Sequence, residues 1–144
     1  MIEHFVITDE FGTSRFDVRG RLSLTQRLSL CDQTGRELAE IRKHLMSTRH
    51  DIVVDGQAVA QVHHEGFFGE KYEVDSQFGR ITAKGDFGGW NYSIHDGHQL
   101  IATVSREFAL REKFLVDVAN DVNDVFILAI VLAIDAIHDE RRQN

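Results

Sequence analysis

Apolar and polar residues alternate along most of the chain from residue 2 to residue 118, as they do in strands with one buried face. Phe16 and Val18, for example, alternate with charged residues, and Trp90, Tyr92 and Ile94 fall on one face of a later segment. The pattern predicts eleven strands, near residues 3–8, 14–19, 27–31, 37–43, 50–54, 58–64, 70–75, 80–86, 90–95, 99–106 and 113–118.

Short polar turns separate these strands at a regular interval. Their leading residues, Asp9, Asp32, Asp55, Asp75 and Asp96, stand 20 to 23 positions apart. An Asp-Gly pair between apolar runs, as at Asp55 and Asp96, predicts a type I′ turn with positive φ at both central residues. The Asp-x-x-Gly form, as at Asp9 and Asp32, predicts a type I turn followed by a left-handed glycine. Successive hairpins imply an antiparallel meander.

The segment 122–137 breaks the alternation and predicts a helix. Ten apolar residues run from Val125 to Ile134, so the helix is apolar all round and has to be buried on all sides. Residues 120–124 offer capping side chains, and Arg141 and Arg142 suit the carboxyl end of the helix dipole. We expect a buried helix over about residues 122–139, with its core residues at Val125, Phe126, Leu128, Ala129, Ile130, Leu132 and Ile134.

If the sheet closes into a barrel with the helix inside it, the apolar face of the meander and all sides of the helix are buried together. Closure also removes the exposed sheet edges on which chains aggregate. We therefore expect a mainly β fold, with an antiparallel meander closed into a barrel around a C-terminal helix. The 144 residues, 42% of them apolar, fit one folded domain over residues 1–144 and exclude general disorder.

Composition narrows the function classes. The single cysteine, Cys31, excludes an internal disulfide framework and indicates a reducing compartment. A formal net charge of −7 argues against nucleic acid as a partner. The N-terminus lacks a basic segment followed by an apolar stretch, so we expect no signal peptide. A membrane-spanning helix needs roughly 20 apolar residues, whereas the apolar run from Val125 to Ile134 has ten. We therefore expect a protein that is not integral to the membrane. We expect it to be cytoplasmic, and peripheral to the membrane at most.

Several stretches resemble a known family. They are Phe5–Gly12, Leu28–Ala39, Asp124–Asp135 and His138–Glu140. In order and spacing they are similar to the LURP-one-related proteins, which share the tubby C-terminal-like fold with the phospholipid scramblases. The resemblance implies a barrel of roughly twelve strands around a hydrophobic C-terminal helix. Members of the family usually carry one more strand before the first strand predicted here, so eleven strands indicate a shortened N-terminus or a mis-assigned start. We expect either to leave a gap beside the first strand, which a tag or a neighbouring chain could fill, the latter forming an oligomer.

Charge is distributed unevenly. Residues 15–49 hold eight basic and four acidic residues, which gives this segment a net charge of +4. Because the whole chain carries −7, the remaining residues together carry −11. Tubby proteins bind phosphoinositide headgroups through basic surface residues, so the resemblance implies a similar site here. Candidate headgroup ligands are Arg15, Arg19, Arg21, Arg27, Arg42, Lys43 and Arg49. The alternative is a solvated face with scattered cross-strand ion pairs.

Other candidate sites are weaker. Asp135, His138 and Asp139 share one helical face and are candidate metal ligands, although they equally suit a polar plug at the mouth of a barrel. The sequence carries none of the common catalytic or phosphate-loop motifs, so we expect neither an enzyme nor a cofactor. Two functions remain open: a non-enzymatic tubby-like barrel that binds anionic phospholipid at a membrane surface, or a soluble protein-interaction or adaptor module without lipid affinity.

Overall fold

The computed structural model describes residues 4–21, 27–44, 47–66, 70–77, 79–107 and 113–143. These residues form eleven β-strands followed by one α-helix. The elements are β1 (His4–Thr8), β2 (Ser14–Arg21), β3 (Arg27–Asp32), β4 (Glu37–Lys43), β5 (His50–Val54), β6 (Gln57–Glu65), β7 (Lys71–Ser76), β8 (Gly79–Asp86), β9 (Asn91–Asp96), β10 (Gln99–Glu107), β11 (Lys113–Val118) and α1 (Asp124–Gln143). Each strand boundary lies within two residues of its prediction.

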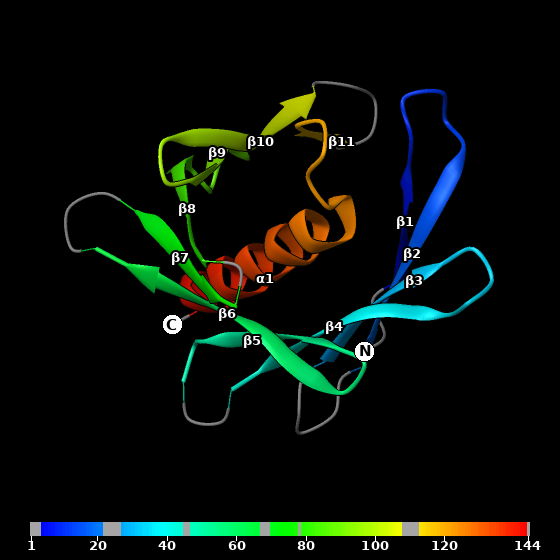
Figure 1. Cartoon of the computed structure of the whole chain (residues 1–144), viewed down its shortest axis with the longest axis horizontal. Helices are drawn as coiled ribbons and strands as arrows, with labels where there is room; N and C mark the ends of the chain where they lie inside the picture. The colour runs from blue at the N-terminus through cyan, green and yellow to red at the C-terminus, as the bar shows by residue number, and fades with distance from the viewer. Residues whose placement is uncertain are drawn as a thin grey trace.

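All the strands belong to one sheet, in the order of the sequence from β1 to β11. Every neighbouring pair is antiparallel, which confirms the meander. The sheet curls around α1, which lies within the curl (Figure 1). The fold is therefore mainly β, with the helix as its central element.

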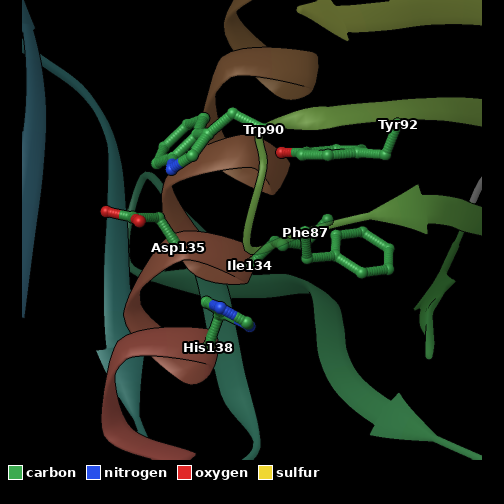
Figure 2. A pocket seen from close by; sticks show the side chains of 6 residues that line it. All are labelled: Phe87, Trp90, Tyr92, Ile134, Asp135 and His138. Atoms are coloured by element: carbon green, nitrogen blue, oxygen red, sulfur yellow. The ribbon is translucent and has the colours of Figure 1, made fainter. Parts of the chain in front are cut away.

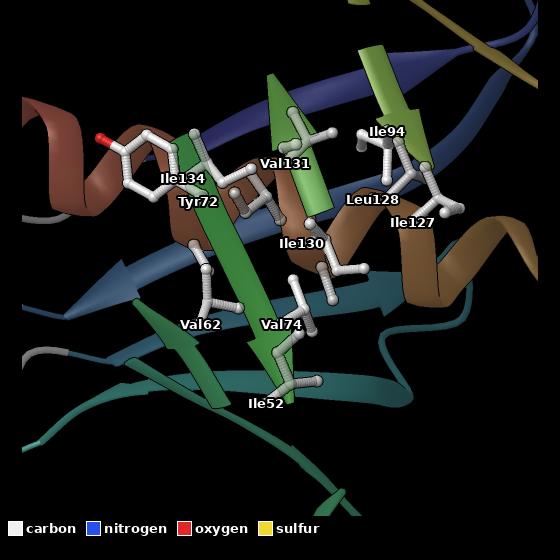
Figure 3. Close-up of a cluster of buried hydrophobic side chains, with 14 of the residues drawn as sticks. Ile52, Val62, Tyr72, Val74, Ile94, Ile127, Leu128, Ile130, Val131 and Ile134 are labelled. Carbon is white, nitrogen blue, oxygen red and sulfur yellow. The ribbon is translucent and has the colours of Figure 1, made fainter. Parts of the chain in front are cut away.

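The core forms where the inner face of the sheet meets the helix. Side chains from many strands, among them Ile52, Val62, Val74 and Ile94, are fully buried against α1 (Figure 3). Burying one such side chain stabilises a fold by roughly 1.5–3 kcal/mol. Residues 127–134 are all buried. Because the sheet covers every side of this part of the helix, all eight residues can be apolar.

The helix agrees with its prediction in type but differs in detail. It begins at Asp124, where the Asn123 side-chain oxygen accepts a hydrogen bond from the Phe126 amide at 3.1 Å, and it ends at Gln143. Five of the predicted core residues are buried: Leu128, Ala129, Ile130, Leu132 and Ile134. Val125 and Phe126 are only half-buried, because the first turn of the helix emerges from the curl of the sheet.

Turn chemistry follows the sequence closely, with one exception. Gly12 and Gly35 have φ of 82° and 87°, as the Asp-x-x-Gly turns require, and Asp55 and Gly56 have φ of 51° and 78°, as a type I′ turn requires. The prediction for Asp96 is wrong. Asp96 pairs with Gln99, so the two turn residues are Gly97 and His98, and of these only Gly97 has positive φ.

The two ends of the sheet remain as edges. β1 pairs with β2 and β11 pairs with β10, and no ladder joins β1 to β11 among the described residues. The predicted closure into a barrel is therefore not confirmed. What the structure describes is a curled sheet of eleven strands around a helix.

Candidate functional site

Cross-strand register brings three arginines into one row on β2, β3 and β4. Arg21 stands opposite Arg27, and Arg27 stands opposite Arg42. Because side chains alternate along a strand, Arg27 and Arg42 lie on the outer face, opposite to the inward Ile41. We call Arg21, Arg27 and Arg42 the basic row; the side chain of Arg21 itself lies outside the described residues.

A single carboxylate holds the two described arginines of this row. The Glu40 carboxylate accepts from Arg42 through Nε at 2.6 Å and Nη2 at 3.3 Å, and the Arg27 Nε lies 3.5 Å from it. The bond to Glu40 raises the pKa of Arg42. Asp51 stands opposite Arg42 on β5, and the carboxylates of Glu37 and Asp51 also raise the pKa of Arg42.

Two more candidate headgroup ligands, Arg15 and Arg19, lie exposed on the outer face of β2. The guanidinium of Arg15 lies 5.7 Å from the ring centroid of its neighbour Phe16. Arg19 stands opposite Ser29, next to the pair formed by Arg21 and Arg27. The structure therefore places Arg15, Arg19, Arg27 and Arg42 on three adjacent strands of one face.

Lys43 and Arg49 lie apart from this group. The side chain of Lys43 lies on the inner side of β4 and forms an ion pair with Glu140 near the end of α1. Arg49 follows β4 in the connection to β5, where its Nη2 lies 3.3 Å from His44 Nε2 and its Nε is buried. The ion pair of Lys43 could not be predicted from sequence, because its Glu140 partner lies 97 positions away.

A second candidate site lies near the carboxyl-terminal part of α1. It is a pocket lined by Phe87, Trp90, Tyr92, Ile134, Asp135 and His138, and we call it the aromatic mouth (Figure 2). Phe87 and Trp90 come from the turn between β8 and β9, Tyr92 comes from β9, and the other three residues come from the helix. Trp90 has a φ of 52°, which is rare for a bulky residue and marks local strain.

Polar atoms are buried around the aromatic mouth without a hydrogen-bond partner in the described residues. They are the hydroxyls of Tyr72 and Tyr92, both ring nitrogens of His138 and the Nε2 of His64. Burial raises the pKa of Tyr72 to about 12 and also raises that of Tyr92, whereas it lowers the pKa of His64. Burial therefore favours the neutral forms of these groups.

The metal candidates do not assemble into a centre. In the part of the chain that the structure describes, no group of three or more His, Cys, Asp or Glu side chains is placed to hold a metal ion. Asp135 and His138 line the aromatic mouth, while Asp139 is exposed on the last turns of α1.

Cys31 is buried on β3, and this burial raises the pKa of its thiol. A thiol that stays protonated is a poor nucleophile. The residue therefore packs as a small apolar side chain.

These features define a class of protein: a curled β-meander built around a C-terminal apolar helix, with a basic outer face on its early strands. The sequence model of the LURP-one-related family matches residues 2–135, nearly the whole chain, and the chain belongs to this family. A search of the curated proteins found none that matches it. Within the described residues, no helix has the length and apolar character needed to cross a membrane.

Proposed function

We propose that this protein binds anionic phospholipid headgroups through the outer face of β2, β3 and β4. The observation that carries the proposal is the basic row, in which Arg21, Arg27 and Arg42 stand opposite one another on adjacent strands. Guanidinium groups match the geometry of phosphate oxygens and donate two bonds at once. Such a row offers several donors to one headgroup.

Glu40 supports this role by holding Arg27 and Arg42 close together while the face is empty. Without a shared carboxylate, two facing guanidinium groups would repel each other. With it, the pair still carries a net positive charge, and Arg15 and Arg19 add to it from β2. Each basic residue near an anionic membrane surface contributes about 1 kcal/mol to binding, so this face is suited to a peripheral membrane protein.

The proposal extends to the fold and to the class of function. A curled meander of eleven strands around an apolar helix supports a tubby-like barrel of roughly twelve strands. We place such a protein in the cytoplasm, with reversible attachment to the membrane and no catalytic role. The second candidate function, a protein-interaction module without lipid affinity, is favoured by apolar side chains exposed on the two edge strands.

Co-sedimentation with vesicles tests the lipid proposal. We expect binding to phosphatidylcholine vesicles that contain phosphatidylserine or a phosphoinositide, weaker binding as salt is raised, and little binding to phosphatidylcholine alone. Replacing Arg15→Glu together with Arg19→Glu should weaken binding by roughly 100-fold or more, because two positive charges beside the lipid become negative, a net change of four units.

The matched control is Arg80→Glu together with Lys84→Glu. Both residues are exposed on β8, far along the sheet from β2, and the change in net charge is the same. We expect this control to keep most of its vesicle binding. An equal loss in both variants, or no salt-sensitive binding to anionic vesicles, would contradict the lipid proposal and leave the interaction module.

A further inference from the structure

A hollow lies on the outer face of the sheet beside the basic row. It is bordered by Arg42, by the exposed Glu37 at the start of β4, and by the exposed Asp55 in the turn between β5 and β6. Its volume is about 180 Å³, whereas a single water needs only roughly 10–15 Å³. The hollow therefore has room for a small organic group, and we call it the β4–β5 hollow.

The β4–β5 hollow has an apolar part and a charged part. Val53 of β5 stands opposite Glu40 of β4, so the two side chains share the outer face, and both are buried. The Glu40 carboxylate is already bonded to Arg42 and lies beside Arg27. Glu40 therefore fixes the position of Arg42 at the border, while Val53 offers an apolar contact to whatever enters.

The charge at the hollow is opposite in sign to that of the basic row. The carboxylates of Glu37, Glu40 and Asp55 and the guanidinium of Arg42 border it, which gives a formal net charge of −2. Throughout the described part of the chain, no three His, Cys, Asp or Glu side chains are grouped to hold a metal ion. Because carboxylates accept hydrogen bonds and pair with cations, the group that suits the hollow is an organic cation with N–H donors.

Arg42 connects the two places. It belongs to the basic row, where it stands opposite Arg27, and it also borders the β4–β5 hollow. One small molecule that carries an anion and a cation can therefore reach both. A lone cation would leave the arginines of the row unused, and a lone anion would leave the hollow empty.

We propose that the β4–β5 hollow binds the primary ammonium of a phosphate ester whose phosphate binds to the basic row. Among anionic phospholipids, this chemistry is that of phosphatidylserine. Its headgroup carries a phosphate and a carboxylate for the arginines and one ammonium for Glu37 and Asp55. The inference rests on the proposed function and narrows it to one class of headgroup.

Other headgroups match only half of this arrangement. Phosphatidylglycerol has the same net charge as phosphatidylserine but no amine. A phosphoinositide brings further phosphate groups, which the carboxylates of Glu37 and Asp55 would repel. The trimethylammonium of phosphatidylcholine has no N–H to donate. The hollow therefore predicts a preference among lipids that the total charge of the membrane does not explain.

Vesicles that differ only in one headgroup test this preference. Phosphatidylcholine vesicles carry the same mole fraction of either phosphatidylserine or phosphatidylglycerol, so the surface charge is equal. We expect the full chain to bind the phosphatidylserine vesicles about 10-fold more tightly or better, as one additional charge-assisted hydrogen bond would give. A general attraction of the basic face to negative charge would give equal binding to both.

Asp55→Asn together with Glu37→Gln removes the two exposed carboxylates and keeps the shape of the side chains. Asn before Gly is favoured in a type I′ turn, so it suits the φ of 51° at Asp55. Gln at position 37 can still accept the hydrogen bond from Ser29 Oγ. This variant should bind both kinds of vesicle nearly equally. Its binding to phosphatidylglycerol should not fall, whereas unfolding would weaken both.

The matched control is Asp96→Asn together with Glu107→Gln. Both residues are exposed, and they lie on β9 and β10, several strands away from β4 and β5. The change in net charge is the same as in the double variant at the hollow. We expect the control to keep the preference for phosphatidylserine.

Soluble compounds separate the chemistry of the headgroup from the lipid. Glycerophosphoserine should bind the parent chain in calorimetry and compete with phosphatidylserine vesicles. Glycerol 3-phosphate, which has the phosphate but no amine, should bind about 10-fold more weakly or worse. The double variant at the hollow should not distinguish the two compounds.

The possible failures can be told apart. Equal, salt-sensitive binding to both kinds of vesicle, or an unchanged preference in the double variant at the hollow, would overturn the ammonium site and leave the proposed function standing. Binding of glycerophosphoserine without binding to any vesicle would contradict the lipid proposal, while the chemistry of the hollow would stand. Absence of binding to vesicles and to glycerophosphoserine would overturn both.

Discussion

The indole ring of Trp90 stacks on the phenyl ring of Phe114, with their centroids 3.8 Å apart and their planes inclined by 21°. Trp90 lies in the turn before β9 and Phe114 on the edge strand β11, so the contact bridges two segments on either side of β10. It also holds a residue whose φ of 52° is unfavourable for a large side chain. The stack therefore ties the aromatic mouth to the edge of the sheet.

Replacement of this ring partner should be visible in fluorescence. Phe114→Ala removes the stack, which is worth about 0.5–1.5 kcal/mol beyond the buried area, and should lower the free energy of urea unfolding by at least that amount. Trp90 is the only tryptophan in the chain, so its emission should shift to the red and become easier to quench. Phe11→Ala, at a side chain that is 84% exposed, should change neither. Unchanged emission in the Phe114 variant would contradict the stack.

The buried helix predicts a severe effect at its centre. Ile130 is 0% exposed, so Ile130→Asp would bury an unpaired carboxylate and should abolish cooperative unfolding in circular dichroism. Ile130→Val is the control and should cost only about 0.5–1.5 kcal/mol, because it removes one methylene from the same site. A normally folded Asp variant would mean that α1 does not lie inside the sheet.

Substitution of two glycines by alanine should distinguish a steric clash from backbone strain as causes of lost stability. At Gly85, with a φ of 142°, an added Cβ would lie 2.6 Å from the Asn91 backbone oxygen, so Gly85→Ala should be strongly destabilising in thermal melts. At Gly97, with a φ of 60°, a Cβ would meet nothing within 4 Å. Gly97→Ala should therefore cost only about 1 kcal/mol of backbone strain. Similar melting temperatures for the two variants would argue against the close approach of β9 at Gly85.

The stability of the fold should fall in mild acid through His50. This side chain is 3% exposed and its Nδ1 donates to the Thr48 carbonyl at 2.8 Å, while burial lowers its pKa. The unfolded chain then binds the proton more readily than the folded chain, so stability is full above the unfolded pKa of about 6.5 and is lost as pH falls through it. His64, whose pKa is also lowered by burial, acts in the same direction.

Urea unfolding at about pH 7.5 and at about pH 5.5 measures this effect. The difference between the two free energies should be smaller in His50→Gln than in the parent chain. His98→Gln, at an exposed turn residue, provides the control and should keep the full difference. An unchanged difference in the His50 variant would remove this residue as a source of the acid sensitivity.

Local features of this fold could be predicted from sequence, whereas those that depend on distant partners could not. Alternation along Phe16–Val18 and the Asp-x-x-Gly turns involve neighbouring residues only, and they located strands to within two positions. The ion pair of Lys43 with Glu140 and the stack of Trp90 on Phe114 join segments that only the curl of the sheet brings together. Closure of the sheet likewise depends on the accumulated twist of eleven strands, which sets how near β11 comes to β1. No pattern of residues in the sequence predicts that distance.

The place of α1 at the end of the element order has a consequence for biosynthesis. Translation produces β1 to β11 before the helix that fills their inner face, so the apolar sides of the strands leave the ribosome without their packing partner. Neighbouring hairpins can form early because their contacts are local, but the core cannot condense until residues 124–143 have emerged. Until then, the apolar face of the nascent sheet stays exposed, and exposed apolar surface makes such an intermediate prone to aggregation.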